Sequence, residues 1–225
     1  MASIKLCEIA AHVRAKRERR KEARPGELLA AALSLFVDKG YAATRVEEVA
    51  KLAGVSKGTL FLYFPSKEEL FKAVVRENIS GRFSEWSDEL QHYQGTSSEL
   101  LRYCMLSWWE RIGSTKACGI PKLMMSEGLN FPELADFYDK EVIGPGEALI
   151  RRIVQRGISS GEFREIDMKY AAYLVLAPML FLSMAKHSPG QWSDPGAELN
   201  PQEYIAMQVD TLLHGLCTAS QVHQH

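Results

Sequence analysis

The stretch VEEVAKLAGVSKGTLFLYFPSKEEL, from Val46 to Leu70, decides the fold of the N-terminal part of the chain. Apolar residues recur at helical spacing on both sides of Gly54, which predicts two short helices. Gly54 can adopt a positive φ in the tight turn between them, and Ser56 is placed to cap the second helix. A third helix start follows at Ser66. This order predicts a helix-turn-helix.

The helix before the turn and the helix after Tyr63 both begin with a capping-box pattern. In Thr44-Arg45-Val46-Glu47, we expect the Thr44 hydroxyl to accept from a first-turn amide while Glu47 reaches back to the amide of Thr44. Ser66-Lys67-Glu68-Glu69 repeats the pattern. The middle helix opens with Ser56-Lys57-Gly58-Thr59, with Thr in the place of the acid. Its first turn therefore keeps an uncompensated positive dipole, which suits phosphates and base edges. A compact three-helix unit that binds no nucleic acid is the alternative.

Helical spacing of apolar residues continues through the rest of the chain, without a convincing alternating strand. The sequence therefore predicts an all-α protein. We expect a basic arm over residues 1–24, a helix-turn-helix domain over 25–80 and a larger helical domain over 81–225. Beyond a single helix over 66–90, the predicted helices are 97–114, 117–128, 132–142, 145–159, 167–187 and 201–219.

Charge is distributed unevenly along the 225 residues, although the formal net charge is only -1. Residues 1–80 carry 15 Lys or Arg and 10 Asp or Glu, so the N-terminal part of the chain is basic. This asymmetry favours an anionic partner for the N-terminal part of the chain, with an ordinary solvated charged surface as the alternative.

Several features predict a cytoplasmic protein. The first residues lack the apolar segment of a secretory signal. The four cysteines are far apart and without CxxC spacing, which is typical of reduced thiols and not of a zinc site. The longest apolar run, residues 170–185, is shorter than the ~20 residues that span a bilayer. We therefore expect a buried helix there, no membrane association and no metal.

Residues 25–72, PGELLAAALSLFVDKGYAATRVEEVAKLAGVSKGTLFLYFPSKEELFK, resemble the DNA-binding domain of the TetR family of transcriptional regulators. The remainder resembles the family in length, in helical character and in phrases such as RGISSGEFR, residues 156–164. The resemblance implies a homodimer, usually a repressor, that binds a palindromic DNA operator. It also implies release from the operator when a small-molecule effector enters the C-terminal domain.

The family pattern implies a role for each matching position of this sequence. Thr44 and Arg45 would meet the DNA backbone, and Tyr63 and Lys67 would reach phosphates. In the middle helix Lys57, Gly58 and Thr59 would enter the major groove, and Ser56 and Phe61 belong to the same set of DNA-binding positions.

Phe61 departs from the family, which commonly has Tyr there and uses its hydroxyl. Phe61 can touch a thymine methyl or turn into the core. The basic arm, with HVRAKRERRKEAR over residues 12–24, can follow DNA or be a solvated tail. We expect a joint at Arg24, because Pro25 disfavours helical geometry there.

Bulky residues collect between Tyr103 and Tyr173 and predict a ligand site, with core packing as the alternative. The residues selected for this site are Trp108, Trp109, Met124, Glu127, Phe137, Tyr138 and Tyr173. Glu127 can meet a cationic ligand or point outward. The helix over 168–186 is apolar nearly all round, so with the final helix it predicts a four-helix dimer interface, unless its own chain encloses it.

Enzymatic interpretations have little support. The six histidines make no metal-ligand spacing, and neither a nucleophile motif nor a phosphate-binding Gly loop is present, so we expect no catalytic site and no cofactor. The rival hypothesis is a helical enzyme or ligand carrier whose helix-turn-helix is vestigial. Within the DNA-binding class, activation and repression both remain open.

Overall fold

The computed structural model describes residues 24–187 and 199–217, and almost all of the basic arm lies outside them. Within these ranges the regular secondary structure is helical, and an isolated antiparallel bridge joins Phe163 to Cys217. The predicted all-α class is confirmed. Two compact units divide between Val74 and Val75, a few residues before the boundary expected at residue 80. Each unit is described by itself below.

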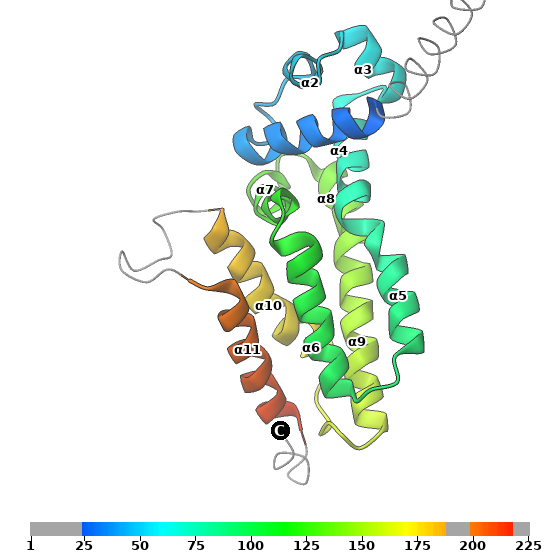
Figure 1. Cartoon of the computed structure of the whole chain (residues 1–225), viewed down its shortest axis with the longest axis vertical. Helices are drawn as coiled ribbons and strands as arrows, with labels where there is room; N and C mark the ends of the chain where they lie inside the picture. Colours follow the sequence, from blue (N-terminus) through cyan, green and yellow to red (C-terminus); the bar gives the residue numbers. More distant parts are fainter. Residues whose placement is uncertain (1–23, 188–198, 218–225) are drawn as a thin grey trace, which may run out of the picture. The chain divides into compact units, whose positions relative to one another are not determined.

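The first unit contains four helices among its described residues. Residues 24–39 form the first, followed by α2 (Val46–Leu52), α3 (Lys57–Tyr63) and α4 (Lys67–Val75), drawn in blue to cyan in Figure 1. Arg24 is already helical in spite of Pro25, and the arm before it, from which a joint was predicted to separate the first helix, lies outside the described residues. The largest fully buried side chains of this unit are Leu28, Phe36, Leu60, Leu70 and Phe71.

Three aromatic rings join the elements of this unit. Phe36 stacks on Tyr41 at 5.6 Å between ring centroids, and the edge of Phe71 meets both rings at 5.3 and 5.5 Å. Such pairs add about 0.5–1.5 kcal/mol each beyond the burial of their area. The first helix, the loop after it and α4 therefore form a firm base for the short helices α2 and α3.

The second unit is a bundle of longer helices with short connecting turns (Figure 1). Its elements are η1 (Arg76–Ser80), α5 (Arg82–His92), α6 (Ser97–Trp108), η2 (Trp109–Gly113), η3 (Lys116–Cys118), α7 (Gly119–Glu127), α8 (Pro132–Tyr138), η4 (Asp139–Ile143), α9 (Gly144–Ser159), α10 (Met168–Lys186) and α11 (Pro201–Leu216). The predicted helices match α6 to α11 closely, apart from three π-helical turns, η1, η2 and η4.

The π-helical turns correct the predicted single helix over residues 66–90. The Gly81 amide donates to the Arg76 carbonyl at 2.9 Å, five residues back, so an extra residue is accommodated in η1. A Cβ on Gly81 would lie 2.7 Å from the same carbonyl oxygen, so a side chain there would collide with the turn. Apolar spacing alone does not reveal such an insertion, because the residues on either side remain helical.

The core of the second unit lies where α6, α9, α10 and α11 pack together. Fully buried members of this core include Leu101, Ile153, Val154, Ala172 and Ile205. Asn200 caps α11 by accepting from the amides of Gln202 and Glu203, and Pro201 occupies the first turn, as the sequence predicts. These contacts make one continuous apolar core for the unit.

A carboxylate closes the N-terminal end of α6. Glu162, from the turn after α9, accepts from the amides of Ser97 at 2.7 Å and Ser98 at 2.8 Å. Burial alone would raise the pKa of the Glu162 carboxyl, but these hydrogen bonds outweigh it and lower the pKa. Glu162 therefore stabilises the junction of α9 with α6 in its ionised form.

Helix α10 carries a large apolar surface outside the core. Among the described residues, α10 is the helix that is long and apolar enough to cross a membrane. Of its most apolar 18-residue stretch, 33% is buried in this unit. A core helix passes the same test, so this is weak evidence for a membrane span. The outward residues Tyr170, Tyr173 and Leu174 are about half exposed, and Met207 on α11 is 73% exposed.

Candidate nucleic-acid interface

The turn between α2 and α3 has the geometry expected from the sequence. Gly54 has a φ of +66°, which side chains rarely adopt, and the Val55 amide donates to the Ala50 carbonyl at 2.9 Å. Val49, Ala50 and Leu60 are buried, which fixes the two helices against the base of the unit. The helix-turn-helix is therefore confirmed in this unit.

The start of α2 differs from the predicted capping box. Arg45, not Thr44, is the N-cap residue, and its amide donates to the Glu48 carboxylate at 3.3 Å. The Thr44 side chain is only 2% exposed, and its hydroxyl donates to the carbonyls of Leu35 and Gly40. The predicted capping role of Thr44 is wrong, because the buried hydroxyl is needed to close the loop after the first helix.

Helix α3 begins as predicted. The Ser56 hydroxyl accepts from the Thr59 amide at 3.1 Å, and the two hydroxyls lie 2.9 Å apart. The first turn of α3 contains no acidic residue. Ser56 and Thr59 therefore satisfy each other at the start of this helix and leave the neighbouring positions to face outward.

One face of α3 is exposed, and the opposite face holds it to the unit. Leu60 points into the core, whereas Lys57, Gly58, Phe61 and Leu62 are exposed. Phe61 is 38% exposed and lies 5.7 Å from the Lys57 ammonium, measured to the ring centroid, so the alternative that places Phe61 in the core is wrong. The exposed face combines a cation, an aromatic ring and a residue without a side chain.

An acid from the neighbouring helix reaches this face. Glu47 of α2 forms an ion pair with Lys57 at 2.6 Å, with both side chains about half exposed. The hydrogen bond from Lys57 lowers the pKa of the Glu47 carboxyl. The predicted lack of a compensating carboxylate is therefore true of the first turn of α3 but not of its surroundings, because the packing of α2 against α3 brings Glu47 to Lys57.

Gly58 is not required by the fold of the unit. A Cβ built there would meet the Ser56 hydroxyl oxygen at 3.8 Å, an ordinary contact, and the Gly58 φ is not positive. An Ala would therefore fit in the isolated chain, and would restrict the unfolded chain more than Gly does. The absence of a side chain at this exposed position is consistent with the close approach of another molecule.

Lys67 and Tyr63 lie beside the exposed face. The Lys67 ammonium donates to the Ala42 carbonyl at 3.1 Å and lies 4.4 Å from the centroid of the Tyr41 ring. Lys67 therefore holds the loop before α2 in this structure, and contact with a phosphate would add to that role or replace it. Tyr63 is half-buried at the end of α3.

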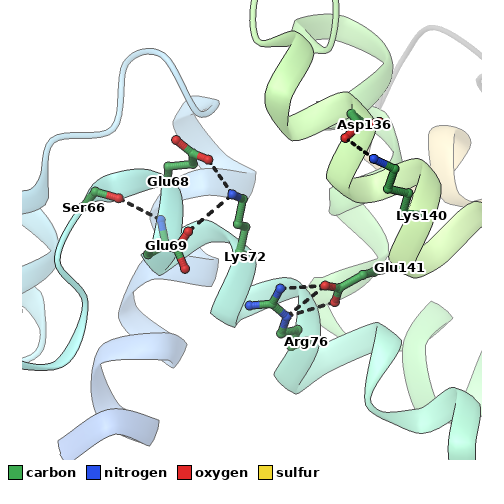
Figure 2. A network of polar contacts seen from close by, with 8 residues as sticks. All are labelled: Ser66, Glu68, Glu69, Lys72, Arg76, Asp136, Lys140 and Glu141. Atoms are coloured by element: carbon green, nitrogen blue, oxygen red, sulfur yellow. Dashed lines mark hydrogen bonds and ion pairs between the residues drawn. The ribbon is translucent and has the colours of Figure 1, made fainter.

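The start of α4 carries half of its predicted capping box. Figure 2 shows the Glu69 amide donating to the Ser66 hydroxyl, at 3.0 Å. The Lys72 ammonium meets the carboxylates of Glu68 at 2.5 Å and Glu69 at 3.3 Å. The Glu69 side chain therefore contacts the next turn of its own helix.

A second cluster in Figure 2 belongs to the second unit. Arg76 of η1 donates through Nε and Nη2 to the Glu141 carboxylate of η4, at distances of 2.6–3.2 Å. Its guanidinium also lies 5.0 Å from the centroid of the Phe137 ring. Two π-helical turns are therefore joined by a bidentate ion pair.

The residues predicted for a ligand site differ in their exposure. Trp109, Met124, Phe137 and Tyr138 are buried, and burial raises the pKa of the Tyr138 hydroxyl. Their placement agrees with the alternative of core packing. Tyr173 is 54% exposed on α10. The Glu127 side chain is half-buried near the end of α7.

Trp108 is the member of that set that lines an apolar cavity in the second unit. Trp86 also lines this cavity and was not selected from the sequence. Its position in α5, ahead of the segment rich in aromatic residues, gave no signal of its own. Within the described ranges, the acidic, His and Cys side chains form no group of three that would hold a metal ion.

Helices α2 and α3 and the turn between them form a helix-turn-helix, an arrangement that many DNA-binding proteins use. Residues 28–74 match the family model described as "Bacterial regulatory proteins, tetR family". This part of the chain is therefore similar to the DNA-binding domain of TetR-family regulators.

Curated relatives match the chain to different extents. The HTH-type transcriptional regulator RutR of Escherichia coli (strain K12) is 50% identical over 62 residues, which cover 28% of this chain and 29% of RutR. The chain therefore matches less than a third of the length of that relative. The HTH-type transcriptional repressor KstR2 of Mycolicibacterium smegmatis is 26% identical over 206 residues, or 90% of this chain and 94% of KstR2.

A solved structure supports the fold of both parts of the chain. The fatty acid degradation regulator FadR from Bacillus halodurans aligns with a TM-score of 0.63 and 21% identity, over 84% of this chain and 94% of FadR. At this identity the likeness shows the fold alone.

Proposed function

We propose that this protein is a ligand-responsive transcriptional repressor that works in the cytoplasm and binds a palindromic DNA operator as a homodimer. The observation that carries the proposal is the match of residues 28–74 to the TetR family, since it includes α2, the turn and α3. The relative that matches over nearly the whole chain is named a transcriptional repressor. Repression is therefore the proposed sign of regulation.

The DNA contacts in this proposal are those that the surface of the first unit can make. Lys57, Gly58 and Phe61 on α3 face the major groove, and Phe61 meets a thymine methyl. Arg45, exposed at the start of α2, contacts a phosphate. Thr44 is omitted, because its side chain is buried.

Four other predicted residues take supporting roles. Ser56 and Thr59 hold the first turn of α3 through their mutual hydrogen bonds, and Thr59 is half-buried there. Tyr63 and Lys67 reach phosphates, Lys67 while it also holds the loop before α2. Contacts of this kind set the position of the protein on DNA, whereas the exposed face of α3 reads the bases.

The outward face of α10 and α11 supports a dimer. Tyr173, Leu174 and Met207 are apolar and at least half exposed in the single chain, and a second copy would remove them from water. In a symmetric dimer each copy presents the same face to the other. The two α3 helices must then lie ~34 Å apart to enter successive major grooves on one side of the DNA.

Release from DNA follows if a ligand binds more tightly to a conformation of the dimer in which the separation of the two α3 helices does not fit successive major grooves. A preference of about 3 kcal/mol weakens operator binding by roughly a hundredfold. The ligand would enter the second unit.

A gel-shift titration tests the proposal. The full-length protein is mixed with the DNA upstream of its own gene, with and without candidate effectors, at several salt concentrations. We expect salt-sensitive retention of the duplex, reduced by an effector. No retention at low salt would contradict the proposal. Ligand binding or turnover that is unaffected by Lys57→Glu and Tyr63→Ala, with no affinity for DNA, would support a carrier or enzyme instead.

A further inference from the structure

An apolar cavity of about 50 Å³ lies inside the second unit between α5, α6, α9 and α10. Its walls include Phe83, Trp86, Met105, Trp108, Ile150 and Met179. Every residue that lines it is uncharged. An ionised group placed inside would lose its hydration without gaining a countercharge from the walls.

Trp86 supplies a hydrogen-bond donor that the protein itself does not use. The residue is only 5% exposed, and its indole Nε1 is buried without a hydrogen-bond partner among the described residues. Buried polar groups are nearly always paired, and leaving one unpaired costs stability. Among the described residues nothing accepts from this N–H, so it is available to an acceptor that another molecule brings.

A paired arginine lies beside the Trp86 ring. The Arg111 guanidinium lies 6.0 Å from the centroid of the Trp86 ring. Its Nη2 donates to the Glu89 carboxylate at 3.0 Å and to the Tyr103 hydroxyl at 3.2 Å. Glu89 neutralises Arg111, so the arginine does not favour an anion in the cavity.

We propose that the cavity binds an uncharged, mainly apolar molecule that carries a hydrogen-bond acceptor, such as a carbonyl oxygen, for the indole N–H of Trp86. Binding in the cavity does not depend on the proposed function, but the identification of the bound molecule as the effector rests on it. The empty space is smaller than the 300–1,000 Å³ typical of ligand pockets, so binding enlarges it. Met105 and Met179, which are unbranched and flexible, can move to make that room.

The test uses two probes of nearly equal shape. Acetophenone carries a carbonyl oxygen where α-methylstyrene carries a methylene group. Isothermal titration of the full-length protein is expected to give about tenfold tighter binding of acetophenone. In Trp86→Phe, which keeps an aromatic ring but removes the N–H, the two affinities should become equal, with that for α-methylstyrene unchanged. Equal affinities in the wild type, or a preference that persists in Trp86→Phe, would overturn the proposal.

Two further variants keep the test decisive. Trp109→Phe removes an indole that is buried but does not line the cavity, so it should keep the preference for acetophenone. Gly146 lines the cavity, and a Cβ there would meet the Phe83 ring at 3.7 Å, so Gly146→Leu should fill the space and abolish binding of both probes. Binding of both probes that survives Gly146→Leu would overturn the location.

Duplex binding is measured on the same samples. Binding of the operator by protein that ignores both probes would overturn the cavity proposal alone. Probe binding with the expected Trp86 dependence, in protein that binds no duplex, would overturn the proposed function and keep the cavity.

Discussion

Replacing Gly58 by alanine should separate the stability of the protein from its binding of DNA. The added Cβ meets only the Ser56 hydroxyl oxygen, at the ordinary distance of 3.8 Å, and the backbone of Gly58 needs no positive φ. Alanine lowers the conformational entropy of the unfolded chain and should stabilise the fold by about 0.5–1 kcal/mol. For a chain of this size that raises the melting temperature by about 1–4 °C.

DNA binding should change in the opposite direction. If α3 lies against base edges, the new methyl group at residue 58 is forced into a close-packed interface, at a cost of about 1–3 kcal/mol. The dissociation constant for the operator should therefore rise by roughly 5- to 150-fold. Fluorescence anisotropy with a labelled duplex gives this ratio, and a thermal melt of the same sample gives the stability.

Gly26→Ala is the matched control. Gly26 is also exposed and helical, with no atom within 4 Å of a Cβ built on it, but it lies on the first helix and not on α3. This variant should bind the duplex as the wild type does. Unchanged affinity in Gly58→Ala, or equal losses in both variants, would refute the reasoning that Gly58 is kept small for DNA.

Three further predictions concern ion pairs and hydrogen bonds. Glu47→Gln releases the Lys57 ammonium from its 2.6 Å ion pair, so the affinity for the duplex should rise a few-fold. In titrations from about 50 to 200 mM salt, the slope of log affinity against log salt should steepen by about 1, and an unchanged slope would contradict this. Glu162→Gln should cost about 1–2 kcal/mol of unfolding free energy at pH 7 in urea melts. Because the folded pKa of Glu162 is lowered, the wild type holds this advantage above the ordinary carboxyl pKa of 4.5 and loses it as pH falls through the folded pKa; a difference independent of pH would refute the assignment. Arg76→Lys should lose the bidentate contact with Glu141 and about 0.5–1 kcal/mol of unfolding free energy. A double-mutant cycle with Glu141→Gln measures the coupling between the two residues, and a coupling of zero would contradict this prediction.

Local chemistry made most of the fold predictable. Gly54 in the turn, Ser56 at the start of α3 and Asn200-Pro201 at the start of α11 each specify a backbone conformation within a few residues, and the structure has all of them. The π-helical turns were missed, because an inserted residue leaves the apolar spacing on both sides helical.

Tertiary contacts explain the differences at the candidate site. Thr44 has the sequence of a cap, but its hydroxyl is taken by carbonyls of the first helix and the following loop. Lys57 pairs with Glu47 across the turn, a contact that depends on how α2 and α3 pack. Trp86 has no sequence motif, and it stands out only because it lines a cavity and its buried N–H has no partner in the part of the chain that the structure describes.

A hydroxyl-radical footprint on a duplex selected from a randomised pool would measure directly whether two copies of α3 read DNA together. The account predicts two protected segments, related by the symmetry of a palindrome and centred about 10–10.5 base pairs or a multiple of that apart. A single protected segment, or none at low salt, would contradict it.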